Sequence, residues 1–472
     1  MTYKRTKIVA TLGPASSSEK VLSDMMDAGM NVCRINFSHG TYDDHKQVIK
    51  RIRAVNEKKK QYTAILADLQ GPKLRVGKMK EGTVLKDNSE LIITTDECEG
   101  DAEKFYLNYE TFPKDVKKGE QVLLDDGNLI LEVIESNGSN EVKMKVKHGG
   151  VLSSNKGVNL PNTKISLPCL TDKDLEDLDF ALEQDVDWVG LSFVRSARDI
   201  LELKHLIKNK GKSAKVIAKI EKPEAVEDID EITRISDGIM VARGDLGVEI
   251  PMQNVPLTQK MIVQLCLKYA KPVIIATQMM ESMITNISPT RAEVNDVANA
   301  VLDGADAVML SAETSVGKFP VKVIEAMSKI VLEIEKTDRV YYHESEPEKN
   351  QKRFVTDSIC FNAVRLANRV DAKAIVNMTH SGYTAFKTSS QRPKARIFVF
   401  TENKRIMTTL SLVWGVECFH YDKKVSTDHT IADIKYVLKK ENMLQEGDLI
   451  INTASMPIEE QGMTNMLKLS NI

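Results

Sequence analysis

Charged and hydroxyl side chains follow a short apolar run near the start of the chain, where they could bind an anion. In VCRINF, residues 32–37, Arg34 and Asn36 lie on one side of an extended chain, because side chains alternate along a strand. Ser38 and His39 come directly after this run. A single polar face of this kind is also typical of an edge strand exposed to water.

The same pattern recurs at the ends of other apolar runs. These side chains are Asp68, Lys73 and Arg75 after residues 63–68, Lys219 and Glu221 around residue 220, Arg243, Gly244 and Asp245 after residues 237–242, and Thr277 at the end of residues 272–277. A phosphorylated anion suits arginine as a planar fork and lysine as a point charge. We therefore predict that Arg34, Arg75 and Lys219 form a phosphate-binding set, with ordinary ion pairing as the alternative.

Glu221 and Asp245 could together hold a divalent cation. Mg²⁺ is usually bound by one or two carboxylates, with substrate oxygens and water as its other ligands. The sequence equally allows each carboxylate to cap a helix or to pair with Lys219 or Arg243. The role of His39 also has two interpretations, because it could take part in catalysis or be an ordinary turn histidine.

Eight runs rich in apolar and β-branched residues are predicted to be the strands that position these side chains. They cover residues 7–11, 32–37, 63–68, 187–192, 215–220, 237–242, 272–277 and 306–310. Helical periodicity follows most of them, over residues 19–28, 42–58, 172–184, 197–208, 224–235, 255–269, 291–302 and 320–336. Strand and helix alternating eight times predict a (β/α)8 TIM barrel, whose active site lies at the C-terminal ends of its strands.

Two further domains are predicted beside this barrel, which takes residues 1–71 and 169–345. Residues 72–168 separate the third strand from its helix and contain the hairpin signals Asp126-Gly127 and Asn137-Gly138. We expect them to form a small all-β lid over the barrel mouth. Residues 346–472 are predicted to form a C-terminal α/β domain for effector binding and assembly, with strands at 374–378, 396–400, 415–419 and 448–453.

The composition argues against several classes of protein. The 65 Lys and Arg residues nearly balance the 67 Asp and Glu residues, so the charge gives no reason to expect a nucleic acid or an anionic membrane as partner. No apolar run is long enough for a signal peptide or a membrane span. The six cysteines contain no C-x-x-C pair and suit reduced thiols, which predicts a cytoplasmic protein.

The chain resembles the pyruvate kinase family from end to end. The matching motifs are TKIVATLGPAS, GMNVCRINFSHG, GVNLPNTKISLPCLTDKD, SDGIMVARGDLGVEIP, IIATQMMESM and PTRAEVNDVANAVLDGADAVMLSAETSVGKFP. The family has the same plan of barrel, inserted lid and C-terminal domain. The resemblance implies phosphoryl transfer from phosphoenolpyruvate to ADP, which gives pyruvate and ATP in the last step of glycolysis.

The resemblance also implies roles for individual residues. Glu221 and Asp245 would hold Mg²⁺ or Mn²⁺, and Arg34 and Lys219 would bind the transferring phosphoryl group. The backbone N–H groups of Gly244 and Asp245 and the hydroxyl of Thr277 would receive the substrate carboxylate. The residues expected near the nucleotide, between barrel and lid, are His39, Arg75 and Lys173.

Two other functions fit parts of the pattern. A metal-dependent lyase or aldolase acting on a 2-keto acid could use the same Glu and Asp pair, but it would not need the lid. A binding or regulatory protein could have kept the fold and lost the chemistry. The complete set Arg34, Lys219, Glu221, Asp245 and Thr277 argues against that second alternative.

The stretch ADLQGPKLRVG, residues 67–77, departs from the commonest family pattern, L-D-T-K-G-P-E-I-R. Most pyruvate kinases need K⁺, and the resemblance places its ligands at Asn36, Ser38, Asp68 and Leu69. Lys73 stands where a glutamate is usual, and its ammonium would repel a second cation. We therefore predict that K⁺ is not required, the alternative being a solvated Lys73 that points away from the site.

Regulation and assembly are also implied by the resemblance. The loop of residues 379–390, with Thr379, Ser381, Gly382 and Thr384, corresponds to the site for an effector phosphate, although an ordinary capped helix start is the alternative. Glu459 and Glu460 would approach a second phosphate. We expect an effector with one phosphate, such as a sugar phosphate or a nucleotide, or a weak response to fructose 1,6-bisphosphate. Family members are usually homotetramers.

Overall fold

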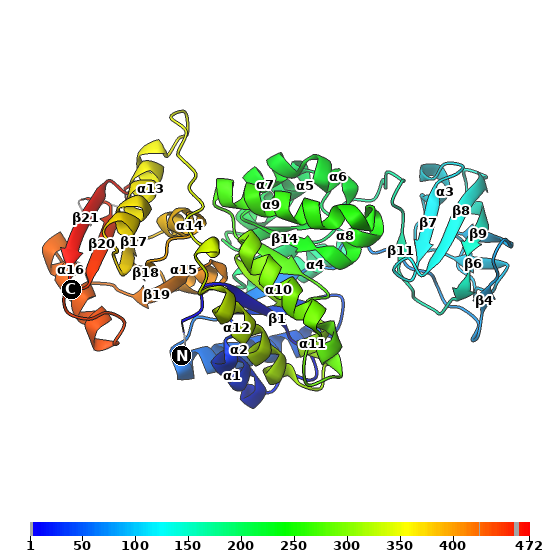
Figure 1. Cartoon of the computed structure of the whole chain (residues 1–472). Helices are drawn as coiled ribbons and strands as arrows, with labels where there is room; N and C mark the ends of the chain where they lie inside the picture. The colour runs from blue at the N-terminus through cyan, green and yellow to red at the C-terminus, as the bar shows by residue number, and fades with distance from the viewer. Residues whose placement is uncertain (1–2, 424, 457–461) are drawn as a thin grey trace.

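The computed structural model describes residues 3–423, 425–456 and 462–472. Figure 1 shows three parts in a row, with the barrel between the inserted lid and the C-terminal domain. All six cysteines are free. Among the described residues, no helix is long and apolar enough to cross a membrane.

The central part is a closed barrel of eight parallel strands, which confirms the predicted fold class. The strands are β1 (Lys7–Thr11), β2 (Val32–Asn36), β3 (Ala64–Asp68), β12 (Trp188–Leu191), β13 (Lys215–Ile220), β14 (Gly238–Ala242), β15 (Val273–Ala276) and β16 (Ala307–Leu310). Around the barrel they follow one another in chain order, and β16 pairs with β1 to close the ring. The strand ends that carry the candidate residues therefore meet at one mouth.

Helices surround the barrel. They are α1 (Glu19–Ala28), α2 (Tyr42–Lys59), α4 (Asp172–Glu183), α5 (Ala197–Asn209), α7 (Ile229–Ile235), α9 (Val255–Tyr269), α10 (Arg291–Asp303) and α12 (Pro320–Ile334). Shorter helices are α6 (Pro223–Glu227), α8 (Arg243–Glu249), α11 (Ala312–Ser315), η1 (Met252–Asn254) and η2 (Glu281–Ile284). Hydroxyl N-caps at Ser18, Thr41, Thr171 and Thr290 begin α1, α2, α4 and α10.

The helix expected over residues 224–235 is divided in two. The chain leaves helical geometry at Asp228, between α6 and α7. The carboxylate of Asp228 accepts a hydrogen bond from the backbone N–H of Ala197, at the start of α5, at 2.9 Å. The continuous helix that periodicity predicts is therefore interrupted at Asp228, whose side chain contacts the neighbouring helix α5 instead.

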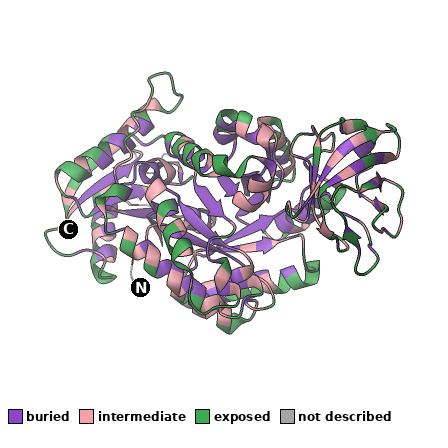
Figure 2. Cartoon of the chain, turned by 45° about the vertical axis from the view of Figure 1, so that its right-hand side comes forward, coloured by how far each residue is buried: buried purple, intermediate pink, exposed green. Residues whose placement is uncertain are grey.

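The two faces of the barrel strands differ as expected. Cys33, Ile35 and Phe37 pack outward in a large core shared with the surrounding helices. Val32, in contrast, belongs to a separate apolar cluster inside the barrel, together with residues such as Trp188. Arg34, two positions after Val32, therefore points into the mouth. Figure 2 shows the buried strands enclosed by helices whose outer faces are exposed.

The lid is a separate β domain with its own apolar core. Its six-stranded sheet has the order β11-β7-β8-β9-β5-β6. The strands are β5 (Glu90–Thr94), β6 (Lys104–Tyr106), β7 (Gln121–Leu124), β8 (Leu129–Ser136), β9 (Glu141–His148) and β11 (Val158–Asn159), beside the pair β4 (Val84–Leu85) and β10 (Gly150–Val151) and the helix α3 (Phe112–Asp115). Both predicted hairpin signals lie at turns between paired strands, β7–β8 and β8–β9.

The C-terminal domain is a five-stranded sheet covered by helices. The strands are β17 (Ala374–Met378), β18 (Arg396–Thr401), β19 (Val416–His420), β20 (Leu449–Ala454) and β21 (Met466–Asn471), in the order β19-β18-β17-β20-β21. The helices are α13 (Phe354–Arg369), α14 (Tyr383–Ser390), α15 (Lys404–Thr409), η4 (Leu410–Leu412) and α16 (Thr427–Lys440), and η3 (Asp338–Val340) precedes them at the end of the barrel part. Only β21 is antiparallel to its neighbour, and it forms one edge of the sheet.

The bottom of the barrel is closed by the C-terminal domain. Leu412 of η4 is buried in the apolar cluster inside the barrel. Trp188, on β12, donates its indole N–H to the carbonyl of Thr409 at 3.2 Å. Arg392 of the C-terminal domain forms a buried ion pair with Asp306, at the start of β16, at 2.9 Å. The barrel and this domain are therefore joined at the end opposite the mouth.

Candidate active site

Arg34 on β2 is held by residues from the two flanking strands. Its Nε donates to Oδ2 of Asp68, at the end of β3, at 2.5 Å. Its Nη1 donates to the hydroxyl of Thr11, at the end of β1, at 2.8 Å. Among the described residues no hydrogen bond occupies Nη2, so this nitrogen is free to bind an anion at the mouth.

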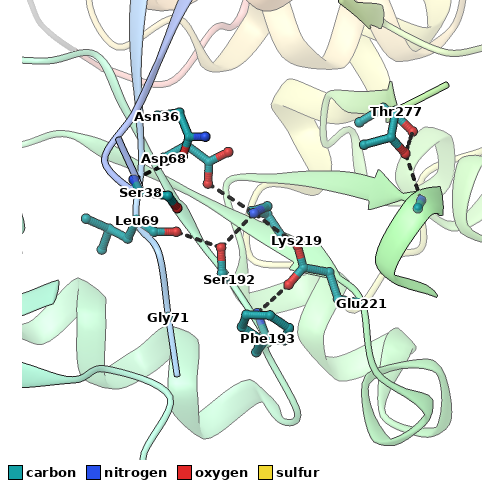
Figure 3. A network of polar contacts seen from close by, with 12 residues as sticks. Asn36, Ser38, Asp68, Leu69, Gly71, Ser192, Phe193, Lys219, Glu221 and Thr277 are labelled. Carbon is teal, nitrogen blue, oxygen red and sulfur yellow. Dashed lines mark hydrogen bonds and ion pairs between the residues drawn. The ribbon is translucent and has the colours of Figure 1, made fainter. Parts of the chain in front are cut away.

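Lys219 on β13 lies among three acceptors (Figure 3). Its Nζ donates to the hydroxyl of Ser192 at 2.6 Å and lies 3.0 Å from Oε1 of Glu221 and 3.1 Å from Oδ1 of Asp68. Burial alone lowers the pKa of Lys219, but Asp68 and Glu221 outweigh it and raise the pKa above its usual value. The ammonium therefore stays charged in the buried mouth.

Asp68 links the two cations. Burial alone would raise the pKa of its carboxyl group, but Lys219 and Arg34 hold that pKa below its usual value. Each of its two oxygens faces one cation, since Oδ2 binds Arg34 and Oδ1 faces Lys219. Asp68 thus fixes the spacing between the guanidinium and the ammonium.

Glu221 and Asp245 are the two carboxylates predicted to hold a divalent cation. Glu221 is 1% exposed and accepts a hydrogen bond from the backbone N–H of Phe193 at 2.7 Å. Burial raises the pKa of Glu221, and the charge of Asp245 acts in the same direction against Lys219. A pair of neighbouring acids with this unfavourable charge fits a bound cation.

Arg243, which the sequence allows as a partner for these acids, is already paired with another residue. Arg243 pairs with Asp296 through two hydrogen bonds of 2.7 Å, so it does not neutralise Asp245. Among the described residues, no group of three or more His, Cys, Asp or Glu side chains could hold a metal ion. The remaining ligands would have to come from substrate and water, as Mg²⁺ prefers.

Thr277 closes the opposite side of the mouth. It has a φ of 69°, a left-handed conformation that is strained for a β-branched residue. Its hydroxyl accepts a hydrogen bond from the N–H of Gly244 at 2.8 Å and donates to the carbonyl of Ala276 at 2.6 Å. The first turn of α8, which contains Asp245, is thereby fixed beside Thr277 (Figure 3).

Family models identify this arrangement. A model described as the pyruvate kinase barrel domain matches residues 3–324, and one described as the pyruvate kinase alpha/beta domain matches residues 357–470. The chain belongs to the pyruvate kinase family. Curated relatives and a solved structure agree with this result over nearly the whole chain.

A pyruvate kinase from Mycobacterium intracellulare is 42% identical over 471 residues, covering 99% of this chain and 98% of the relative. One from Corynebacterium efficiens is 45% identical over 466 residues, covering 98% and 97%. A crystal structure of a pyruvate kinase from Cryptosporidium parvum superposes with a TM-score of 0.93 at 35% identity, covering 99% of this chain and 96% of that one.

The residues expected near the nucleotide are not all gathered at the mouth. His39 is exposed beside the end of β2. Lys173 donates to the carbonyl of Phe37 at 3.2 Å and pairs with Asp177 at 2.5 Å. Arg75 lies in the lid and donates to the backbone of Asn155 at 3.0 Å. Arg34 and Lys219 thus both contact the carboxylate of Asp68, while no described contact joins Arg75 to either cation.

The residues expected at a monovalent cation lie together at the ends of β2 and β3. Asn36 pairs with Asp68 across the two strands, and its side-chain oxygen accepts the N–H of Ser38 at 3.2 Å. The carbonyl of Leu69 accepts the hydroxyl of Ser192 at 2.6 Å. Lys73 lies on the wall of a small cavity between lid and barrel that also contains Asp245.

The expected effector loop borders a cavity of about 850 Å³ in the C-terminal domain. Thr379, Ser381 and Thr384 line it, and the hydroxyl of Thr384 is buried with no hydrogen-bond partner in the part of the chain described. Gly382 begins α14 with a φ of 78° and donates its N–H to the hydroxyl of Thr379 at 3.0 Å. Glu459 and Glu460 lie outside the described residues.

Two buried hydroxyls at the mouth were not among the predicted site residues. Thr11 contacts Arg34, and Ser192 contacts Lys219. Both stand at the end of an apolar run, KIVAT and DWVGLS. A polar residue at the end of an apolar run, the signal that indicated the charged site residues, therefore also marks these two hydroxyls.

Proposed function

We propose that this chain transfers the phosphoryl group of phosphoenolpyruvate to ADP, giving pyruvate and ATP. The observation that carries the proposal is the pair of largely buried cations, Arg34 and Lys219, held on either side of Asp68. Preorganised donors of this kind stabilise the charge of a phosphoryl group in transit. Arg34 would bind the phosphoryl oxygens through its free Nη2, and Lys219 would neutralise charge as the group moves.

Glu221 and Asp245 would hold Mg²⁺ or Mn²⁺, which supplies Lewis-acid charge neutralisation and a template for substrate oxygens when it is bound. The backbone N–H groups at the start of α8 and the hydroxyl of Thr277 would bind the substrate carboxylate. In this structure that hydroxyl donates its proton to Ala276. We therefore assign Thr277 the role of passing a proton to the enolate carbon through water rather than donating it directly.

The nucleotide would bind between barrel and lid. Lys173 and His39 stand at the rim of the mouth beside the end of β2, and Arg75 is carried by the lid. Closure of the lid would bring Arg75 toward the phosphates. Such a movement also excludes water from the transfer.

We further propose that the reaction does not require K⁺. The carboxylate of Asp68 already faces two protein cations, and the carbonyl of Leu69 is hydrogen-bonded to Ser192. Lys73 adds an ammonium to the wall of a cavity that contains Asp245. Like-charge repulsion at this mouth would disfavour a second cation.

A phosphorylated effector and a tetrameric assembly complete the proposal. The cavity beside α14 contains the cations Arg353 and Lys423 as well as the hydroxyls of the effector loop. Exposed apolar residues on two separate parts, such as Leu257 of α9 and Val355 of α13, offer the two interfaces that a tetramer needs. Light scattering at micromolar concentration tests the assembly, and a monomer would contradict it.

One assay tests the proposed reaction. Purified protein is supplied with phosphoenolpyruvate, ADP and Mg²⁺ in tetramethylammonium buffer, and both ATP and pyruvate are measured. Equal formation of the two products supports the proposal, and release of pyruvate and inorganic phosphate without ATP points to a phosphatase. The same assay with K⁺ tests the cation, because strong stimulation would refute K⁺ independence, whereas Lys73→Glu should become partly K⁺-dependent.

A further inference from the structure

We infer that Thr11 and Ser192 are positioning residues, which orient the guanidinium of Arg34 and the ammonium of Lys219 for phosphoryl transfer. This inference rests on the proposed function. Neither hydroxyl is placed to react with the substrate itself. Their effect would be exerted through the two cations that they hold.

Thr11 occupies the end of β1 and is 4% exposed. An arginine side chain can only donate hydrogen bonds, so the Thr11 hydroxyl must accept the one from Nη1 of Arg34 at 2.8 Å. A hydroxyl has a single proton, and here it is donated to the carbonyl of Leu310 on β16 at 2.9 Å. The lone pairs of Thr11 are thereby fixed in the direction of Arg34.

Ser192 repeats this geometry at the end of β12, where it is 2% exposed. Lysine also has donors only, so the hydroxyl accepts the bond from Nζ of Lys219 at 2.6 Å. Its own proton goes to the carbonyl of Leu69, after β3, at 2.6 Å. Figure 3 shows Ser192 between this carbonyl and the ammonium.

The two hydroxyls are the ends of one polar chain across five adjacent strands. The members are Thr11 on β1, Arg34 on β2, Asp68 on β3, Ser192 after β12 and Lys219 on β13. By contact the order is Thr11, Arg34, Asp68, Lys219 and Ser192, so each cation receives one hydroxyl and one oxygen of the shared carboxylate. Rotation of either cation would break contacts on two sides.

A neutral acceptor suits this purpose better than another carboxylate. A hydroxyl holds a cation in place without cancelling its charge, which the phosphoryl group needs. Asp68 and Glu221 already balance Arg34 and Lys219 in number. A further acid at either hydroxyl position would lower the positive potential of the mouth.

The experiment compares substitutions that remove only the hydroxyl. Thr11→Val keeps the shape of the side chain, and Ser192→Ala removes one atom. A misplacement of a catalytic group by about 1 Å can cost about 100-fold in rate. We expect kcat to fall about 10- to 100-fold in each variant, while KM for ADP stays within about twofold. Thr11→Ser, which keeps the hydroxyl, should retain most of the activity.

Thr314→Val is the matched control. Thr314 is fully buried at the same mouth and donates to the backbone carbonyl of Thr11 at 2.8 Å, but within the described residues it contacts neither cation. Its kcat should equal that of the wild type. The thermal midpoints of Thr11→Val and Ser192→Ala should lie close to that of the control.

Several results would overturn the inference. One is unchanged kcat in both Thr11→Val and Ser192→Ala, and another is an equal loss in Thr314→Val. A loss in Thr11→Ser as large as in Thr11→Val would also assign the effect to packing. Inactive wild-type protein would instead refute the proposed reaction, because every comparison is made relative to wild-type turnover.

Discussion

Replacing Arg392 with methionine should destabilise the junction between the barrel and the C-terminal domain. Arg392 is 1% exposed and donates to Oδ2 of Asp306 at 2.9 Å and to the carbonyl of Gly304 at 2.7 Å. Its guanidinium also lies 4.9 Å from the centre of the Trp414 ring. Methionine keeps much of the apolar volume but leaves Asp306 without its counter-ion.

The expected loss follows from what remains around Asp306. Removing one partner of a buried ion pair typically costs about 3–5 kcal/mol, because the other charge stays buried. Asp306 keeps hydrogen bonds from the backbone N–H groups of Val273 and Trp414, both at 3.1 Å. These two donors place the loss at the lower end, at about 3 kcal/mol.

Urea unfolding followed by circular dichroism at pH 7 measures this loss. The decisive comparison is the double variant Arg392→Met with Asp306→Asn, which removes the uncompensated charge. We expect the double variant to recover at least about 1 kcal/mol relative to Arg392→Met alone. A single variant within about 0.5 kcal/mol of the wild type, or a double variant less stable than the single one, would refute the reasoning.

Three further predictions follow from the site and the barrel base. Lys219→Met should lower kcat by about 100-fold or more with unchanged far-UV circular dichroism, and a near-normal rate would remove its role. In Gly244→Ala the new methyl group would lie 3.4 Å from Oγ1 of Thr277, an ordinary van der Waals contact, so KM for phosphoenolpyruvate should stay within about twofold; a KM raised about 10-fold would contradict this. Burial raises the pKa of Asp187 to about 6, above about 4 in the unfolded chain. The protonated carboxyl group of Asp187 therefore contributes to the free energy of unfolding in full below about pH 4. This contribution is lost as pH rises through about 6, and the loss is about 3 kcal/mol in all. Urea midpoints measured from pH 4 to 7 should show this loss in the wild type and a flatter profile in Asp187→Asn.

The strands of the barrel could be predicted from the sequence because each is a short apolar run with polar residues at its end. The predicted runs at residues 7–11 and 215–220 coincide with β1 and β13, and the others differ from the observed strands by a single residue at one or both ends. Periodicity also predicted that Arg34 faces inward. These features depend on local alternation, which a single strand contains in full.

The contacts within the mouth depend on the order of strands around the barrel. Lys219 and Asp68 are far apart in the sequence and meet because only β12 separates β13 from β3. The left-handed backbone of Thr277 has no composition signal either, since β-branched residues avoid that region. The position of Arg75 depends on how the lid lies over the barrel, which local sequence does not encode.

The insertion of the lid has a consequence for synthesis of the chain. Its central strands pair with sequence neighbours, β7 with β8 and β8 with β9, so the lid can form its sheet as soon as it is made. Of the first three barrel strands, β2 can pair with both neighbours early, but β1 and β3 must each wait for a second partner strand. β3 pairs with β12, which follows the whole lid, and β1 pairs with β16 at the far end of the barrel. Both edges of the half-made barrel therefore stay open while most of the polypeptide emerges, which makes them the segments most in need of protection from aggregation.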